Sequence, residues 1–309
     1  MKISLTFITL IALSIACKAQ KINIALNLTK GSTYYLTSAA NLALYQNISG
    51  QDVNLITTIT CTVSHKVIEV KDSAYVMEVK YDRMKMQMTV ADRNIDFDSD
   101  KKDAKDVSSI IMSGMLDQPF NIVLTKTGKI LSVDHIENLY IHMFDGLPNL
   151  TEEKKNQLKA QMQKSFGARS FKTNFEEAFA IFPDHNIEKN DTWLKTITMS
   201  AAISAKMSTT FTLTDITDNA LIIHGNSIFG SDDSGNGEYK EANGFQIRLK
   251  NVSGTGASNI KIDKATGWVI ESKSSRTIKA DAVIKDSPKI PGGMTYPMTI
   301  TSELTVNGK

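Results

Sequence analysis

The side chains that could carry out chemistry are few and lie far apart in the sequence. Five histidines occur, and the two with the most suggestive spacing are His135 and His142. Seven residues of helix span about 10 Å, which is too far for two imidazoles to bind one metal ion. The histidine pattern therefore predicts no metal site.

Nucleophilic and cofactor chemistry have no recognisable motif in the sequence. A Gly-x-Ser-x-Gly elbow and a Gly-rich phosphate loop are both missing. Cys61 lies in a strand-like apolar run, where a cysteine is expected to act as a small buried hydrophobe. The loop 230–244 matches part of a calcium loop, but it has Asn243 where that loop needs a bidentate Glu. We therefore expect a protein that is not an enzyme and that holds no cofactor.

The elements that would position any site begin after an export signal. Lys2 precedes a short apolar run, so residues 1–19 are predicted to be a signal peptide. Cleavage after Ala19, which the sequence favours, leaves a free periplasmic or extracellular protein that starts at Gln20. The alternative is cleavage before Cys17, whose lipidated thiol would anchor an outer-membrane lipoprotein.

The charge balance argues against nucleic-acid binding. The chain has 35 Lys and Arg residues and 33 Asp and Glu residues, for a formal net charge of +2, and the basic residues are dispersed. The mature chain, residues 20–309, is short enough to form one β domain. We predict a single domain, no nucleic-acid partner, and membrane contact only through an anchor at Cys17.

Strand signals dominate both ends of the chain. The runs 33–46, 53–70 and 74–90 are rich in Val, Ile, Thr and Tyr and are separated by turn residues. In the third run the apolar residues move from odd positions, ending at Tyr81, to even positions, beginning at Met84. Because alternate residues of a strand face opposite sides, this change predicts a β-bulge near Arg83.

A helical block is predicted to interrupt the strands, over residues 105–116 and 134–182. Apolar residues recur there with helical spacing, and Thr151 before two Glu residues is typical of a helix N-terminus. Gly167 separates that helix from a third one. The third helix carries a stripe of phenylalanines, namely Phe171, Phe175, Phe179 and Phe182.

Two similar stretches of strands flank the helical block, at about residues 22–135 and 191–307. Each contains a strand, a Thr-Gly turn and another strand, with Gly128 in the first stretch and Gly267 in the second. This similarity predicts an internal duplication. The expected fold class is mainly β (α+β), with a long, curved antiparallel sheet or open barrel and an inserted block of about three to four helices covering one face.

Three segments resemble a known family. They are KTGKILSVDHIENL (126–139), LTEEKKNQLKAQMQKSFG (150–167) and AIFPDHNIEKNDTW (180–193), which are similar to an uncharacterised family of secreted and lipid-anchored envelope proteins of Bacteroidota. The resemblance brings no catalytic residue with it. Asn190 stands where the family pattern has Gly, and Asn also tolerates a left-handed turn. A curved sheet covered by helices is distantly similar to the lipoprotein-carrier folds of bacterial envelopes.

Two groups of apolar side chains are candidates for a ligand-binding surface. They are Met84, Met86 and Met88 of one strand and Phe171, Phe175 and Phe179 of the third helix. Thioethers adapt easily to lipids, and a helical aromatic stripe could line a cavity. The alternative for both groups is ordinary core packing.

One turn carries a candidate modification site. Ser73, within Asp72-Ser73-Ala74, matches the acceptor pattern of a bacterial O-glycosylation system. The alternative is an unmodified Asx turn.

Three functions from different classes fit these observations. The first is binding of an apolar small molecule or lipid in a cavity between sheet and helices. The second is a non-catalytic envelope scaffold or protein-interaction module. The third is a hydrolase, which no motif or residue cluster in the sequence supports.

Overall fold

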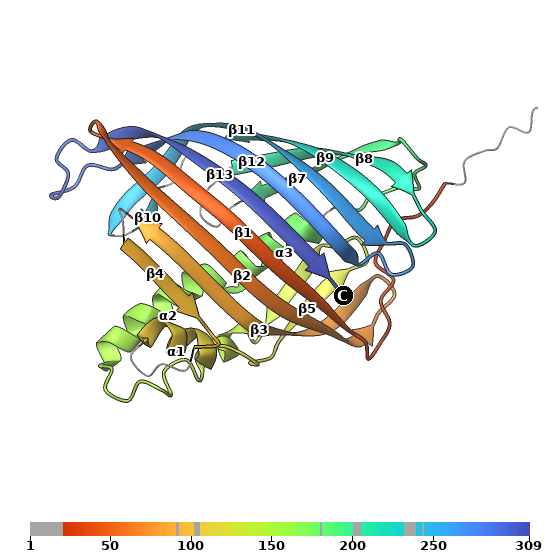
Figure 1. The fold of residues 1–309 in the computed structure, drawn as a ribbon, viewed down its shortest axis with the longest axis horizontal. Coiled ribbons are helices and arrows are strands. Elements are labelled where there is room, and N and C mark those ends of the chain that lie inside the picture. The colour runs from red at the N-terminus through yellow and green to blue at the C-terminus, as the bar shows by residue number, and fades with distance from the viewer. Residues whose placement is uncertain are drawn as a thin grey trace, which may run out of the picture.

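The computed structural model describes residues 21–90, 93–101, 106–179, 181–199, 205–231, 239–242 and 244–309. The signal segment 1–19, Cys17 and residues 232–238 of the calcium-like loop lie outside these ranges. The described chain is mainly β, and a single large sheet arches over a helix (Figure 1).

Thirteen antiparallel strands make up the sheet. They are β1 (Thr33–Ile48), β2 (Gln51–Val70), β3 (Ala74–Val90), β4 (Arg93–Asp98), β5 (Phe120–Thr125), β6 (Ile130–Asp134), β7 (Thr192–Met199), β8 (Ala205–Ile216), β9 (Ala220–Ser231), β10 (Lys240–Ala242), β11 (Phe245–Asp263), β12 (Val269–Ile284) and β13 (Met294–Gly308). Their order is β6-β5-β3-β2-β1-β13-β12-β11-β9-β8-β7, with β4 paired to β3 and β10 to β11. Two meanders, one from each end of the chain, therefore join where β1 pairs with β13.

Helical structure is limited to a few segments. These are α1 (Val107–Gly114), a 3-10 turn η1 (Ile136–Tyr140), α2 (Glu152–Phe166) and α3 (Ala168–Phe179). As predicted, Thr151 caps α2, because its hydroxyl accepts a hydrogen bond from the amide of Lys154.

The predicted block of about three to four helices covering one face is wrong. α2 and α3 form one long bent helix across Gly167, and the apolar stripe around Leu139 forms only a 3-10 turn. Five residues are too few to offset the cost of nucleating an α-helix, and His135 before them has a left-handed backbone with φ of 62°. α2 has no buried residue, so α3 is the part of this bent helix that fills the sheet.

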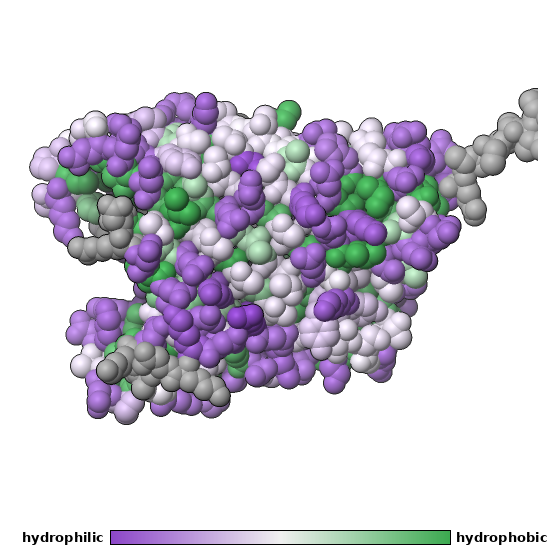
Figure 2. Space-filling view, in the orientation of Figure 1, coloured by the Kyte–Doolittle hydropathy of each residue, from purple (hydrophilic) through white to green (hydrophobic). Residues whose placement is uncertain are grey.

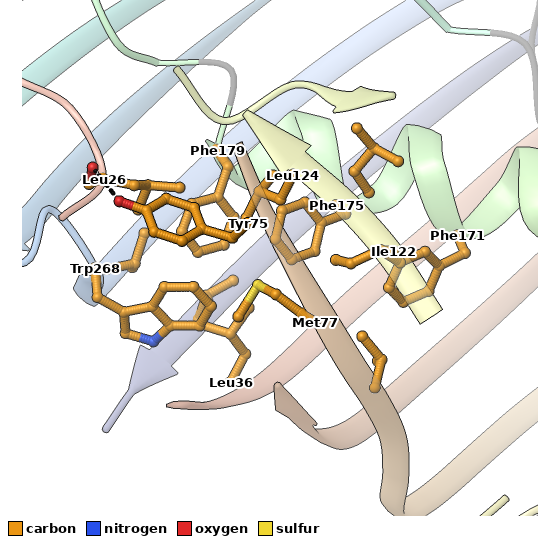
Figure 3. Close-up of a cluster of buried hydrophobic side chains, with 14 of the residues drawn as sticks. Leu26, Leu36, Tyr75, Met77, Ile122, Leu124, Phe171, Phe175, Phe179 and Trp268 are labelled. Carbon is orange, nitrogen blue, oxygen red and sulfur yellow. Dashed lines mark hydrogen bonds between the residues drawn. The ribbon is translucent and has the colours of Figure 1, made fainter. Parts of the chain in front are cut away.

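The main core lies between α3 and the face of the sheet that it contacts, which we call the inner face. The rings of Phe175 and Phe179 stack 4.5 Å apart, and Phe179 lies 4.7 Å from Trp268 beside β12 (Figure 3). The N-terminal segment closes the same end, because the hydroxyl of Tyr75 donates to the carbonyl of Leu26 at 2.9 Å. Elements from both ends of the chain thus share one core.

The predicted bulge in β3 is confirmed. Asp82 has no partner in the β2–β3 ladder, where Thr62 pairs with Arg83 and Val63 pairs with Tyr81. The extra residue lets Tyr81 and Met84 face the same side of the sheet although their positions differ in parity. Asp82 itself accepts a hydrogen bond from the Ser64 hydroxyl at 2.9 Å.

Three predicted turn positions adopt the left-handed backbone that their residue types permit. The φ angles are 80° at Gly128, 70° at Gly267 and 73° at Asn190. Asn190 thus serves the turn for which the family pattern uses Gly. The internal duplication that the two Thr-Gly turns suggested stays a prediction.

Candidate functional site

The strand register places one row of residues across the inner face, at the edge of the area that α3 covers. Met88, Thr57, Leu42, Ser302 and Arg276 are successive partners on β3, β2, β1, β13 and β12. Partners in antiparallel strands point to the same side of the sheet. The Arg276 side chain reaches α3, which identifies the row as part of the inner face.

This row lies where a packed part of the inner face meets a part that stays accessible. Under α3 the inward side chains Val67, Met77 and Val79 are fully buried. Around and beyond the row, most inward positions of β1, β2 and β3 are also apolar but only partly buried, whereas Thr57 within the row is a buried hydroxyl residue. We name these residues the inner apolar surface: Leu42, Leu44, Leu55, Ile59, Met86, Met88 and Val90.

The neighbouring strand continues this accessible apolar area. Ile95 of β4 is the ladder partner of Met88 and is 40% exposed. In the space-filling view the molecule is notched on the left, between the strand ends and α2, and apolar side chains are visible along the upper margin (Figure 2). The apolar residues of this end are therefore within reach of solvent.

The structure separates the six candidate ligand residues into two environments. Phe171, Phe175 and Phe179 pack in the main core, and Met84, which is 2% exposed, joins them there. Met86 and Met88 lie on the inner apolar surface. All six lie on the inner side of the sheet, the phenylalanines on α3 and the methionines on β3, because the bulge at Asp82 turns the methionines inward.

Sequence reasoning missed most of the inner apolar surface. The even positions of β1 include Leu36, Leu42 and Leu44, and this alternation was the signal that could have identified its inward side. Arg276 was missed because a lone arginine in a strand carries no motif. Arg276 becomes a candidate binding residue only in the structure, where it faces inward among apolar and hydroxyl residues.

Arg276 and Glu177 form an ion pair between the sheet and α3. The guanidinium donates to a carboxylate oxygen of Glu177 at 3.1 Å, and the two side chains are 25% and 13% exposed. Charged hydrogen bonds are strongest where water is largely excluded. The pair therefore fixes the end of α3 against the centre of the inner face.

His65 is a buried polar residue of the core that sequence reasoning did not single out. Its ring lies between Phe175, at 5.4 Å, and Trp268, at 5.5 Å, and neither ring nitrogen has a hydrogen-bond partner. Burial lowers the pKa of His65 to about 4, against a smaller opposing effect of the backbone at Tyr34 and Val63. The imidazole is neutral under ordinary conditions.

The remaining candidates do not form a catalytic constellation. A pocket of about 480 Å³ is lined by Ser113 and by the pair His142 and Asp145, whose Nδ1 and carboxylate oxygen are 2.8 Å apart. The pair is exposed, and Ser113 lies in the last turn of α1, where the helix dipole disfavours an oxyanion. Burial raises the pKa of the Cys61 thiol to about 12, which leaves it a poor nucleophile.

Two further positions bear on binding and modification. A groove of about 720 Å³ runs across the strands from Ile56 to Asn226, lined mainly by outward residues and also by Leu42, Arg276 and Ser302 of the row. Ser73 lies in the exposed turn between β2 and β3, as expected of an acceptor, and its modification stays a prediction.

Within the described ranges, no three His, Cys, Asp or Glu residues are grouped so that they could hold a metal ion.

No helix in the part of the chain that the structure describes combines the length and apolarity needed to cross a membrane. No curated protein matches the sequence.

Solved structures give distant similarities only. A lipovitellin structure, which concerns lipid–protein interactions, matches with a TM-score of 0.49 and 8% identity over 92% of this chain and 25% of that chain. This chain thus spans about a quarter of lipovitellin. An outer-membrane channel from Pseudomonas putida F1 and the outer-membrane protein OprG from Pseudomonas aeruginosa match with TM-scores of 0.24 and 0.23 and identities of 7% and 6%. Each covers 91% of this chain and 97% of the other chain. Structural similarities with TM-scores this low carry no argument about the function of this chain.

The sequence itself gives a closer relationship. A family model matches residues 72–269, from the β2–β3 turn to the first residue of β12. The match includes α3 and the strands from β3 to β11, and it agrees with the predicted membership of an uncharacterised family. The chain belongs to a family of unknown function, DUF6263.

Proposed function

We propose that this protein binds an apolar small molecule or lipid on the inner apolar surface. The observation that carries the proposal is the partial exposure of Leu42, Leu44, Leu55 and Met88 at inward positions of a curved sheet. In a core that binds no ligand, inward-facing apolar residues are normally covered, as Val67 and Met77 are here. Accessible apolar area on a concave face is typical of a binding surface.

The predicted export signal supports placing this activity in the cell envelope. In our proposal the protein acts without catalysis, as a carrier or receptor of an apolar molecule. The second candidate function is a non-catalytic scaffold, for which the groove supplies a surface with the 49% exposed Ile56 at one end.

Binding of Nile red, a neutral apolar dye, tests the proposal. The variant Leu44→Gln changes an inward residue, and Tyr45→Gln changes its outward neighbour on the same strand. Loss of one buried leucine contact is expected to weaken dye binding by about tenfold in Leu44→Gln. Tyr45→Gln is expected to bind like the unchanged protein.

Two results would overturn the proposal. One is a protein that does not enhance Nile red fluorescence. The other is equal weakening in both variants, which would place the dye elsewhere. Thermal unfolding of each variant checks that both remain folded.

A further inference from the structure

Arg276 is a cationic group of the inner face that lies beside the inner apolar surface. Arg276 is the partner of Ser302, and Ser302 is the partner of Leu42. Three other lysine or arginine residues occupy inward register positions of the described strands. They are Arg93 opposite Val90, Lys240 opposite Ile247, and Lys195 on β7, which binds Asp184 at 2.7 Å. Arg276 is the one that shares a row of ladder partners with Leu42 and Met88.

The surroundings of Arg276 suit the polar end of a ligand. Ser274 lies two positions away on β12 and Ser302 is the direct partner on β13, so hydroxyl side chains share its face. The hydroxyls of Ser274 and Ser302 can donate hydrogen bonds to an anion that the guanidinium attracts.

Glu177 uses only part of the hydrogen-bonding capacity of Arg276. A guanidinium has five N–H donors in a fixed fork, and among the residues that the structure describes it donates one hydrogen bond, to Glu177. Arginine forks pair readily with a second carboxylate or phosphate. The partly buried position, at 25% exposure, strengthens such a contact without closing it off.

The row of partners also sets a direction for the rest of the ligand. Arg276 and Met88 lie four interstrand steps apart, which is roughly 19 Å at the usual strand spacing. Between them lie Ser302, Leu42 and Thr57, and Thr57 is a buried hydroxyl residue next to Met88. A ligand whose polar head lies at Arg276 would place its apolar chain against Leu42, Leu55 and Met88 of β1, β2 and β3.

We propose that the ligand of the inner apolar surface is an amphiphile with an anionic head group, which Arg276 binds, while its hydrocarbon chain runs toward Met88. This inference rests on the proposed function and names the class of its ligand. Glu177 competes for the same guanidinium, so it weakens anion binding in the unchanged protein.

Displacement of Nile red by four amphiphiles of equal chain length tests the head-group site. Dodecanoate and dodecyl phosphate carry the anionic head, dodecanol is neutral, and dodecyltrimethylammonium is cationic. Both anions are expected to bind about tenfold more tightly than dodecanol, because a charged hydrogen bond is formed. The relative affinity of the two anions separates a fatty-acid head from a phosphate head.

Matched variants assign the preference to Arg276. Arg276→Gln is expected to reduce dodecanoate binding about tenfold while leaving dodecanol unchanged, and Lys195→Gln is the control for an inward cation elsewhere. Glu177→Gln is expected to strengthen dodecanoate binding several-fold. Because Arg276→Gln leaves Glu177 unpaired, the double variant with both changes repeats the test without an isolated buried charge.

The outcomes distinguish this inference from the proposed function. Equal binding of dodecanoate, dodecanol and the cation, unaffected by Arg276→Gln, would overturn the head-group site and leave apolar binding in place. Absence of binding of Nile red and of all four amphiphiles would overturn the proposed function itself. Loss of dodecanoate preference in Lys195→Gln but not in Arg276→Gln would also contradict the assignment.

Discussion

The imidazole of His65 on β2 faces the ring of Phe175 on α3, with the ring centroids 5.4 Å apart. Trp268 meets the same imidazole at 5.5 Å, so the histidine lies where the helix, β2 and the start of β12 come together. Neither ring nitrogen has a side-chain hydrogen-bond partner, and the backbone at Tyr34 and Val63 offsets only part of the cost of burying a positive charge. The docking of α3 therefore depends on His65 staying neutral.

The first prediction concerns the pH dependence of stability. Unfolded histidine titrates near pH 6.5, whereas the pKa of His65 in the folded protein is about 4. Between these values the unfolded chain binds more protons, so the free energy of unfolding rises with pH from 4 to 6.5 and its contribution is complete above 6.5. The shift corresponds to about 3 kcal/mol, lost as the pH falls through this window.

Urea unfolding of the protein and of His65→Phe, each from pH 4 to pH 8, measures this contribution. The phenylalanine variant keeps an aromatic ring in the same space and is expected to lose less stability below pH 6.5. Carboxylates titrate in both proteins, so the difference between the two curves is the quantity of interest. Parallel curves would show that His65 is not responsible.

The second prediction compares two methionines of β3. Met84 is buried in the core and Met88 lies on the inner apolar surface. Met84→Ala is expected to lower the free energy of unfolding by about 2–5 kcal/mol, since it leaves a cavity. Met88→Ala should lower it by less than about 1 kcal/mol.

Urea unfolding checks both methionine values, and Nile red binding supplies the complementary readout. Met88→Ala is expected to weaken dye binding, whereas Met84→Ala should affect binding only through stability. A large loss of stability in Met88→Ala would indicate that this residue belongs to the core.

The third prediction concerns the turn between β5 and β6. Gly128 has φ of 80°, and a Cβ atom there would overlap the carbonyl oxygen of Phe179 at the end of α3. Gly128→Ala is therefore expected to destabilise the protein by more than about 3 kcal/mol, through backbone strain and displacement of the helix. Chemical denaturation measures the effect.

Gly50, between β1 and β2, is the matched control for this turn. Its φ is 84°, but no atom lies within 4 Å of a Cβ built on it. Gly50→Ala should therefore show the strain alone, about 1 kcal/mol. Equal effects in the two variants would mean that the contact with Phe179 contributes nothing.

The fourth prediction concerns the mature N-terminus. Intact mass measurement of the protein isolated from its host is expected to give a chain that begins at Gln20 without lipid. A diacylglyceryl addition on Cys17 would instead identify a membrane-anchored form. The comparison needs no variant, because the two forms differ both in length and in added mass.

The sequence by itself determined the features that depend on neighbouring residues. The change of parity between Tyr81 and Met84 located the bulge, and Thr151 located the start of α2. Gly128, Gly267 and Asn190 marked left-handed turns. Each signal lies within a few residues, because side-chain alternation, caps and turn geometry are local properties of the backbone.

Only the tertiary structure decided what these elements build. The pairing of β1 with β13 joins the two ends of the chain, and Arg276 meets Glu177 across 99 positions of sequence. The spacing of apolar residues predicted helix α3 and the inward side of β3. It could not predict which inward residues would be buried and which would stay accessible to solvent. Burial depends on which distant segments pack together, and for this chain that packing covers Met84 but leaves Met88 accessible.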